Sequence, residues 1–205
     1  MSKKTGNIDL RIRRTRKMLL DSLISLIVEK GFEALTVKDI AEKAMINRAT
    51  FYNHYEDKLD LLERGMDEVF DELTQLAEKP HENGKEVLES GPPRAMIAAL
   101  KHMAENSNFY KAMLGKNGVP AFIERIQKYN TEIIRRRIEY LVSQSKQKPL
   151  VPLEIVVNYT ASSYSGMAVW WIQNDMPIPA EEMVRHYITL NVLGLYRCLG
   201  LTVPD

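Results

Sequence analysis

The sequence has very little cysteine: Cys198 is the single thiol among its 205 residues, so no disulfide framework is possible within the chain. The charged N-terminal segment also lacks the apolar run and small-residue cleavage site of a secretory signal. These two absences predict a protein of the reducing cytoplasm. Its content of 45% hydrophobic and 27% charged residues is typical of globular proteins.

Motifs of catalytic and metal sites are missing as well. The four histidines are scattered along the chain, and no HExxH, Cys/His cluster, Gly-rich phosphate loop or G-x-S-x-G sequence occurs. We therefore predict no catalytic residue, no metal site and no cofactor. An α-helical enzyme remains a remote alternative, which turnover of any substrate would support.

Strand signals are nearly absent, since no alternating Val/Ile/Thr-rich runs are joined by tight turns. Apolar residues recur at helical spacing throughout, which predicts an all-α protein. A short helix is expected after Thr36, and Pro80–Pro93 is expected to be a connector between domains. The other predicted helices span residues 9–30, 48–55, 58–79, 94–106, 108–114, 119–146, 153–174 and 180–200. Gly31 is expected to end the first of them.

Positive charge is concentrated at the N-terminus, although the net charge of the chain is only +1. Residues 1–17 contain seven Lys or Arg side chains and one acidic residue, Asp9. A basic front end favours contact with a polyanion. A solvated basic tail is the alternative.

Two short helices joined by a brief turn follow the first long helix, which is the helix-turn-helix arrangement. Thr36 with Asp39 forms a capping-box pattern for the first short helix, and Asn47 is a suitable N-cap for the second. Within the second, Phe51 and Tyr55 lie four residues apart and are expected to fill a small core.

The other face of this second short helix carries groups that suit the major groove of double-stranded DNA. Arginine pairs with guanine, asparagine with adenine, and a methyl group with thymine. The predicted base-reading residues are Arg48, Ala49 and Asn53. Phosphate oxygens suit neighbouring polar groups, and the predicted phosphate contacts are Thr36, Asn47, Thr50, Tyr52, His54 and Lys58. Ordinary packing is the alternative for Tyr52 and His54.

The segment LTVKDIAEKAMINRATFYNHYEDKLDLL resembles the DNA-binding domain of the TetR family of transcriptional regulators, whose signature is T-V-x-D-I-A-x-x-A-G-V-S-x-x-T-L-Y-x-H-F-x-x-K-x-x-L-L. The matching positions are Thr36, Ile40, Ala41, Ala44, Thr50, Tyr52, His54, Lys58, Leu61 and Leu62. The resemblance implies a DNA-binding domain at 1–57, a connecting helix at 58–79, and an effector-binding and dimerisation domain at 80–205. It also implies a homodimeric repressor that a small ligand releases from a palindromic operator.

Two residues depart from this signature. Met45 replaces the glycine of the turn, and Asn47 replaces the serine cap. The turn commonly needs a positive φ, which costs a non-glycine residue about 1–2 kcal/mol. We therefore expect reduced local stability at Met45.

The C-terminal half is predicted to supply the subunit contact. No charged residue occurs from Ile155 to Asn174, but the polar groups in this segment argue against a membrane span. We expect this helix to be buried on several sides. The last helix carries two apolar stripes, and which of them faces a partner stays open. The predicted dimer-interface residues are Met167, Trp170, Val184, Ile188 and Leu195.

An effector pocket is expected among the C-terminal helices, although ordinary core packing is the alternative for each candidate. The candidates are His102, Tyr110, Asn158, Tyr164 and Trp171. This half, from NFYKAML to MVRHY, resembles the subgroup of the dihydroxyacetone kinase regulator. A protein partner instead of a small ligand, with activation of transcription, is the second reading. The run Arg135–Arg137 is predicted to be a solvated helix face.

Overall fold

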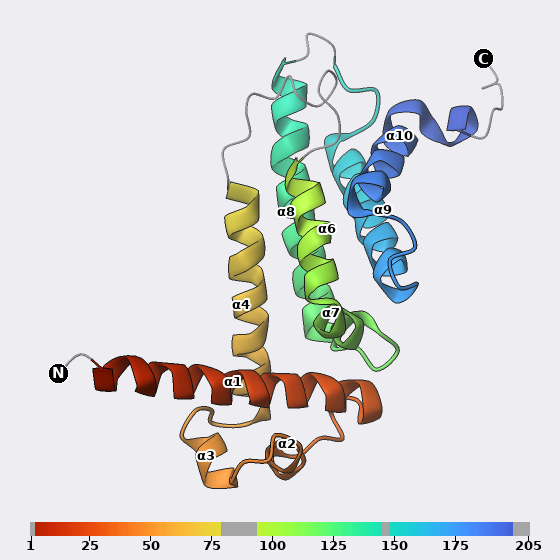
Figure 1. Cartoon of the computed structure of the whole chain (residues 1–205). Coiled ribbons are helices and arrows are strands. Elements are labelled where there is room, and N and C mark those ends of the chain that lie inside the picture. The colour runs from red at the N-terminus through yellow and green to blue at the C-terminus, as the bar shows by residue number, and fades with distance from the viewer. Residues whose placement is uncertain (1–2, 79–93, 145–147, 199–205) are drawn as a thin grey trace. The chain divides into compact units, whose positions relative to one another are not determined.

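The computed structural model describes residues 3–78, 94–144 and 148–198 (Figure 1). The described residues form α-helices and contain no strand, which confirms the predicted fold class. The helices are α1 (Lys3–Lys30), α2 (Val37–Lys43), α3 (Arg48–Tyr52), α4 (Lys58–Glu78), α6 (Arg94–Glu105), α7 (Ser107–Leu114), α8 (Pro120–Gln144), α9 (Leu153–Gln173) and α10 (Ala180–Cys198). The expected connector at 80–93 lies outside the described residues.

Most helix ends agree with the predicted ends, and α1 and α3 are the exceptions. Helix α1 begins at Lys3 and not at residue 9 as predicted. Helix α3 ends early. It was expected to continue to Tyr55 but ends at Tyr52, with Asn53 as its C-cap. The backbone N–H of His54 and that of Tyr55 both donate to the carbonyl of Phe51, at 2.9 and 3.0 Å. The chain therefore completes one tight turn there instead of another turn of helix.

The chain forms two compact units. Each unit combines two separate segments of the chain, so the units are not divided at one position near residue 80. One unit contains Met1–Glu72 together with Asn108–Phe122, and the other contains Leu73–Ser107 together with Ile123–Asp205. We call them the N-terminal unit and the C-terminal unit. Both α4 and α8 begin in the N-terminal unit and continue into the C-terminal unit.

Packing against α1 holds the N-terminal unit together. Its fully buried side chains are Leu19, Leu23, Ile27, Ile40, Phe51, Leu61, Leu62, Tyr110, Met113 and Phe122. Gly31, at φ 77°, ends α1 and donates its N–H to Ile27 O at 2.8 Å, so the predicted glycine stop is confirmed. Asn117 Nδ2 donates to Val28 O at 3.2 Å, which ties the segment after α7 to the end of α1.

The C-terminal unit is centred on α6, α8, α9 and α10. Its core includes Ile134, Ala161, Tyr164 and Tyr187, with Met96, Ile138, Met167 and Ile188 packed against them. Within one subunit, α9 leaves Ile155, Tyr159 and Trp170 exposed. Its buried residues are Val157, Ala161, Tyr164, Ala168, Trp171 and Ile172. No described helix is both long and apolar enough to cross a membrane.

The expected stripes of α10 need a correction. Val184 is fully buried in its own subunit, with Met183 and Tyr187, so Val184 does not face a partner. Gly194 has φ 74° and ψ 161°, which interrupts the regular helix there. The side chain of Leu195, another predicted interface residue, lies outside the described part of the structure.

The turn between α2 and α3 has the geometry of a Schellman motif. Ile46 N–H donates to Ala41 O at 3.0 Å, and Met45 N–H donates to Glu42 O at 3.1 Å. Met45 occupies the position usually taken by glycine, with φ 52° and a side chain 87% exposed. The expected positive φ at Met45 is therefore confirmed.

We predict that Met45→Gly raises the free energy of unfolding by up to about 1 kcal/mol, because glycine adopts this φ without a Cβ penalty. Urea denaturation measures the change. Ala44→Gly is the control, since Ala44 has φ −75° and should lose stability when replaced by glycine. An unchanged or lowered stability of Met45→Gly would show that the turn is not strained.

Candidate DNA-binding site

The orientation of α3 is set by a buried aromatic pair. Phe51 is 0% exposed, and its ring centroid lies 5.8 Å from that of Tyr55, which is also buried. Asn47 Oδ1 accepts the Ala49 N–H at 2.9 Å and caps the start of the helix. One face of α3 is thereby held in the core, and the opposite face is left to solvent.

The three predicted base-reading residues share this outer face. Arg48, Ala49 and Asn53 are all exposed. Arg48 Nη2 donates to the Tyr52 hydroxyl at 3.4 Å, and the Arg48 guanidinium carbon lies 6.0 Å from the Tyr52 ring centroid. Tyr52 is half exposed, so its ring supports the arginine at the surface. The face offers a cation, a methyl group and an amide together, while contact with bases stays a prediction.

Two of the predicted phosphate contacts already serve as helix caps. The Thr36 hydroxyl accepts the Asp39 N–H at 3.2 Å, and Asp39 Oδ2 accepts the Thr36 N–H at 2.9 Å, which completes the expected capping box. Hydrogen bonds from the Thr36 side chain and backbone hold the pKa of Asp39 below its usual value. The Asn47 side chain likewise accepts a hydrogen bond, from the Ala49 N–H. Both residues therefore shape the recognition motif in addition to any phosphate contact.

His54 is partly buried beside the basic part of α1. Burial lowers its pKa first, and the positive charge of Arg16 lowers it further. The imidazole is therefore neutral at neutral pH and offers one N–H donor to a phosphate. Thr50 is also partly exposed, so both residues remain candidates for phosphate contact.

Lys58 makes contacts within the chain that the sequence did not predict. Its ammonium donates to Phe32 O at 3.0 Å and to Glu33 O at 3.1 Å, and it lies 4.7 Å from the centroid of the Phe32 ring. These contacts join the start of α4 to the chain that leaves α1. Lys58 therefore positions α4 in the described structure, a role that sequence spacing did not reveal.

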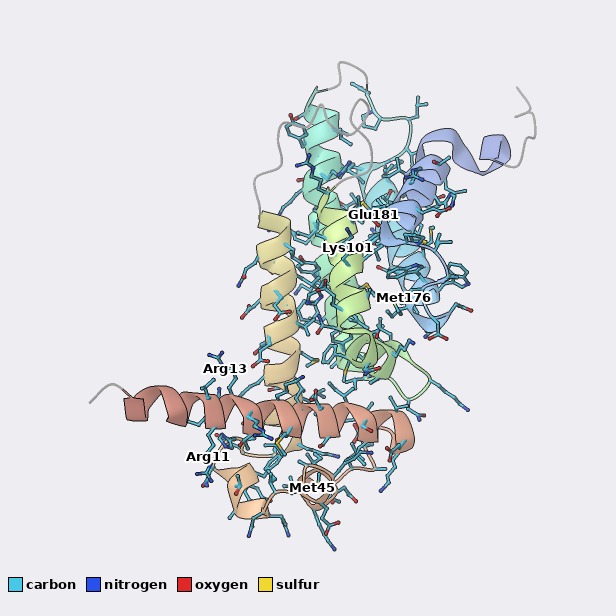
Figure 2. The ribbon with its side chains drawn as sticks, viewed as in Figure 1. Arg11, Arg13, Met45, Lys101, Met176 and Glu181 are labelled. Carbon is cyan, nitrogen blue, oxygen red and sulfur yellow. The ribbon has the colours of Figure 1, made fainter. Side chains whose placement is uncertain are left out.

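The basic side chains near the start of α1 project from two sides of the helix. Figure 2 shows Arg11 on the side of α1 nearer α3, whereas Arg13 points from the opposite side. Arg11 is exposed. The count of basic residues in the sequence predicted a polyanion contact but did not single out Arg11, because that distinction needs the helix and its orientation.

The five predicted effector-pocket residues are divided between the two units. Tyr110 belongs to the N-terminal unit, where its ring lies 6.0 Å from that of Phe122. The others lie in the C-terminal unit, where Trp171 Nε1 donates to Ile178 O at 2.8 Å and His102 is buried. Tyr164 is buried, with its ring 5.4 Å from that of Tyr187.

Asn158 is exposed on α9 and lines a shallow hollow of about 430 Å³. The remaining lining residues are Glu154, Ile155, Tyr159 and Ser162. Asn158 Nδ2 donates to Glu154 O at 2.8 Å. The hollow is part of the exposed face of α9 and does not include the other four pocket candidates.

Two family models match this chain. The model described as "Bacterial regulatory proteins, tetR family" matches residues 19–64, which include α2 and α3. The model described as "Transcriptional regulator C-terminal region" matches residues 92–191. The chain belongs to the TetR family of transcriptional regulators. Such regulators bind DNA through the helix-turn-helix domain, and the matched domains and relatives are regulators and not enzymes.

Curated relatives extend the match over nearly the whole chain. The HTH-type transcriptional regulator YxbF of Bacillus subtilis is 25% identical over 203 residues, covering 97% of this chain and 50% of YxbF. This chain thus spans half the length of that relative. The HTH-type transcriptional repressor KstR2 of Mycolicibacterium smegmatis is 22% identical over 191 residues, covering 90% of this chain and 92% of KstR2.

Solved structures share the fold at low sequence identity. A TetR-family regulator of Syntrophomonas wolfei is 19% identical with a TM-score of 0.67, covering 94% of this chain and 99% of that one. FadR of Bacillus subtilis, solved with stearoyl-CoA, is 15% identical with a TM-score of 0.63, covering 87% and 98%. The dihydroxyacetone kinase operon activator DhaS is 17% identical with a TM-score of 0.57, covering 87% and 94%. The last similarity shows the fold and does not confirm the predicted subgroup.

Replacing the outer-face arginine tests base reading. Arg48→Ala is expected to cost about 1–3 kcal/mol on a specific site and much less on random DNA, because a bidentate base contact is lost. Fluorescence anisotropy with both duplexes measures the two losses. Arg64→Ala is the matched control, because Arg64 lies on α4 and is paired with Asp60 at 2.7 and 3.0 Å. Equal losses of Arg48→Ala on both duplexes would remove its base-reading role.

Lys58→Met separates a structural role from a phosphate contact. Losing two charged hydrogen bonds at a partly buried site should lower the free energy of unfolding by about 1–2 kcal/mol. The salt dependence of DNA binding should stay the same, whereas loss of a phosphate contact would reduce its slope by about one. Thermal melting and binding at several salt concentrations give the two readouts. Unchanged melting with a reduced slope would restore the phosphate role.

Proposed function

We propose that this protein is a homodimeric repressor that reads a palindromic operator with α3 and leaves it when a small ligand binds the C-terminal unit. The observation that carries the DNA-binding part is the exposed face of Arg48, Ala49 and Asn53, fixed by buried Phe51. A single five-residue helix reads few base pairs. Two copies related by a two-fold axis would read two half-sites about 34–36 Å apart or a multiple of that distance.

The exposed face of α9 supports the homodimer. Tyr159 is 66% exposed and Trp170 is 51% exposed. Between them, Ser162 is exposed and Gly166 has open space where a side chain would begin, so another helix can approach closely. No charge interrupts residues 155–174, and a second copy of the same face meets no charge repulsion on this helix. Large exposed apolar faces of this kind are typical of subunit contacts.

Among the predicted interface residues, Trp170 is therefore the one we retain in the contact. Met167 and Ile188 pack against the core of their own subunit. They can support the contact from beneath, while Ile155, Tyr159 and Trp170 supply its surface. We therefore propose that α9 makes most of the partner contact.

Names of similar proteins support repression and a ligand. KstR2 is described as a repressor, and IcaR of Staphylococcus aureus as a negative regulator. FadR was solved with stearoyl-CoA. DhaS is described as an activator, which keeps activation through a protein partner as the second candidate. In either case α4 and α8 are the helices that continue from one unit into the other.

Selection of bound duplexes from a random pool tests the proposed function at physiological salt. A palindromic consensus with two half-sites is the expected result. The selected site, placed before a reporter gene, then gives the sign of regulation, and repression is expected. Salt-sensitive binding without any consensus would contradict sequence-specific regulation by this protein alone.

Trp170→Glu tests the subunit contact. A charge placed on the apolar α9 face should shift the protein to monomers and weaken binding to the full palindrome at least about tenfold. Analytical ultracentrifugation and anisotropy measure the two effects. Tyr140→Glu on α8, with a side chain 46% exposed, is the matched control and should remain dimeric. A dimeric Trp170→Glu variant would place the contact elsewhere.

A further inference from the structure

The three consecutive arginines of α8 have different surroundings, contrary to the expectation of one solvated face. Arg135 pairs with Glu154 through two hydrogen bonds of 2.5 and 2.7 Å, and Arg136 pairs with Glu132 at 2.9 Å. Arg137 turns inward. Its Nη2 atom is buried and has no hydrogen-bond partner within the described residues.

Burying a guanidinium without an acceptor is costly, because the charge loses its hydration and gains no hydrogen bond in return. Burial lowers the pKa of Arg137, but an arginine remains protonated at neutral pH. A fully satisfied side chain would need acceptors for its donors. Such an unsatisfied buried group therefore calls for a specific explanation.

Neighbouring tyrosines do not neutralise Arg137. The positive charge of Arg137 acts on Tyr187, yet burial raises the pKa of Tyr187 to about 12, so its phenol stays neutral. Its hydroxyl donates to Thr160 O at 2.9 Å. Burial also raises the pKa of Tyr164. The surroundings of Arg137 thus contain hydroxyl groups but no phenolate at neutral pH.

Three carboxylates of the C-terminal unit are engaged with other cations. Glu154 and Glu132 hold Arg135 and Arg136. Glu181 pairs with Lys101 at 2.5 Å, and both are labelled in Figure 2. Each of these pairs is complete without Arg137. The counter-charge for Arg137 is therefore not one of these three carboxylates.

Apolar side chains lie on the same side of α8 as Arg137. Helical spacing puts Ile134 and Ile138 on one face, with Arg137 between them. Ile134 belongs to the buried cluster with Ala161, Tyr164 and Tyr187, and Ile138 packs against it. The described members of this cluster are uncharged, so Arg137 brings a positive charge beside apolar and hydroxyl-bearing side chains.

We propose that Arg137 recognises the anionic group of the effector, and that this effector is an apolar organic molecule carrying a carboxylate or a phosphate. The inference rests on the proposed ligand response and names the chemical class of the ligand. The guanidinium supplies paired N–H donors to the anion, which suits both oxyanions. The apolar cluster around Ile134 then receives the hydrocarbon part.

The first test uses the protein without ligand. Replacing Arg137 by Met keeps the length of the side chain and removes the unpaired charge, so the melting temperature should rise by roughly 2–5 °C. Arg136→Met is the control, and loss of its exposed pair should change the melting temperature by less than about 2 °C. A lower melting temperature for Arg137→Met would show that the chain itself supplies the counter-charge, which would overturn the proposal.

The second test compares three probes of equal chain length: octanoate, octyl phosphate and 1-octanol. Calorimetric titration of the wild-type protein should show saturable binding of an anion at least about tenfold tighter than the alcohol. The tighter anion distinguishes a carboxylate effector from a phosphate effector. Arg137→Met should lose this preference and Arg136→Met should keep it. No anion binding at millimolar concentration, or an intact preference in Arg137→Met, would contradict the proposal.

Operator binding separates this proposal from the proposed function. Arg137→Met should still bind the selected operator, because Arg137 lies outside the N-terminal unit. If it binds the operator but the wild-type protein shows no anion preference, only the ligand class is wrong. If the wild-type protein selects no operator, the proposed function fails irrespective of the probes.

Discussion

Burial of Phe51 is the contact on which DNA recognition depends. A helix of five residues has too few internal hydrogen bonds to be stable alone, so α3 exists because its one buried ring and its caps hold it. Once Phe51 is fixed, the positions on the far side of the helix are fixed as well. The core of the N-terminal unit therefore determines where Arg48 and Asn53 point. Recognition in this protein is a consequence of packing, and the polar face can change in sequence without changing the scaffold.

The packing of the N-terminal unit also suggests how a ligand bound in the C-terminal unit could affect α3. The ring of Phe122, at the start of α8, packs against Phe70 of α4 and Phe109 of α7 at centroid distances of 5.7 and 5.4 Å. The helix that carries Arg137 thus begins inside the DNA-binding unit. A ligand that pairs with Arg137 would pull on a helix whose other end is fixed among aromatic rings. Densely packed side chains shift between discrete arrangements and do not deform continuously. This property suits a switch between a DNA-bound state and a released state of the protein.

Local features were predictable from the sequence, and long-range contacts were not. The Thr36 cap, the Gly31 stop and the positive φ of Met45 depend on neighbours within a few residues, and all three were predicted. Lys58 is different, because its flexible side chain can reach a phosphate or a carbonyl, and only the fold brings Phe32 and Glu33 within reach. Arg137 looked like its two neighbours in sequence, but rotation along α8 buries its Nη2 atom without a hydrogen-bond partner among the described residues. The division of the chain inside α4 and α8 was also hidden, because apolar periodicity continues through it.

A structure of the protein on its selected operator would test the account most directly. We expect α3 of each subunit to lie in a major groove, with Arg48 and Asn53 within hydrogen-bond distance of base edges. We also expect the α9 faces of the two subunits to pack against each other across the two-fold axis, with Trp170 buried between them. A complex in which α3 lies outside the groove, or in which Trp170 remains in solvent, would contradict it.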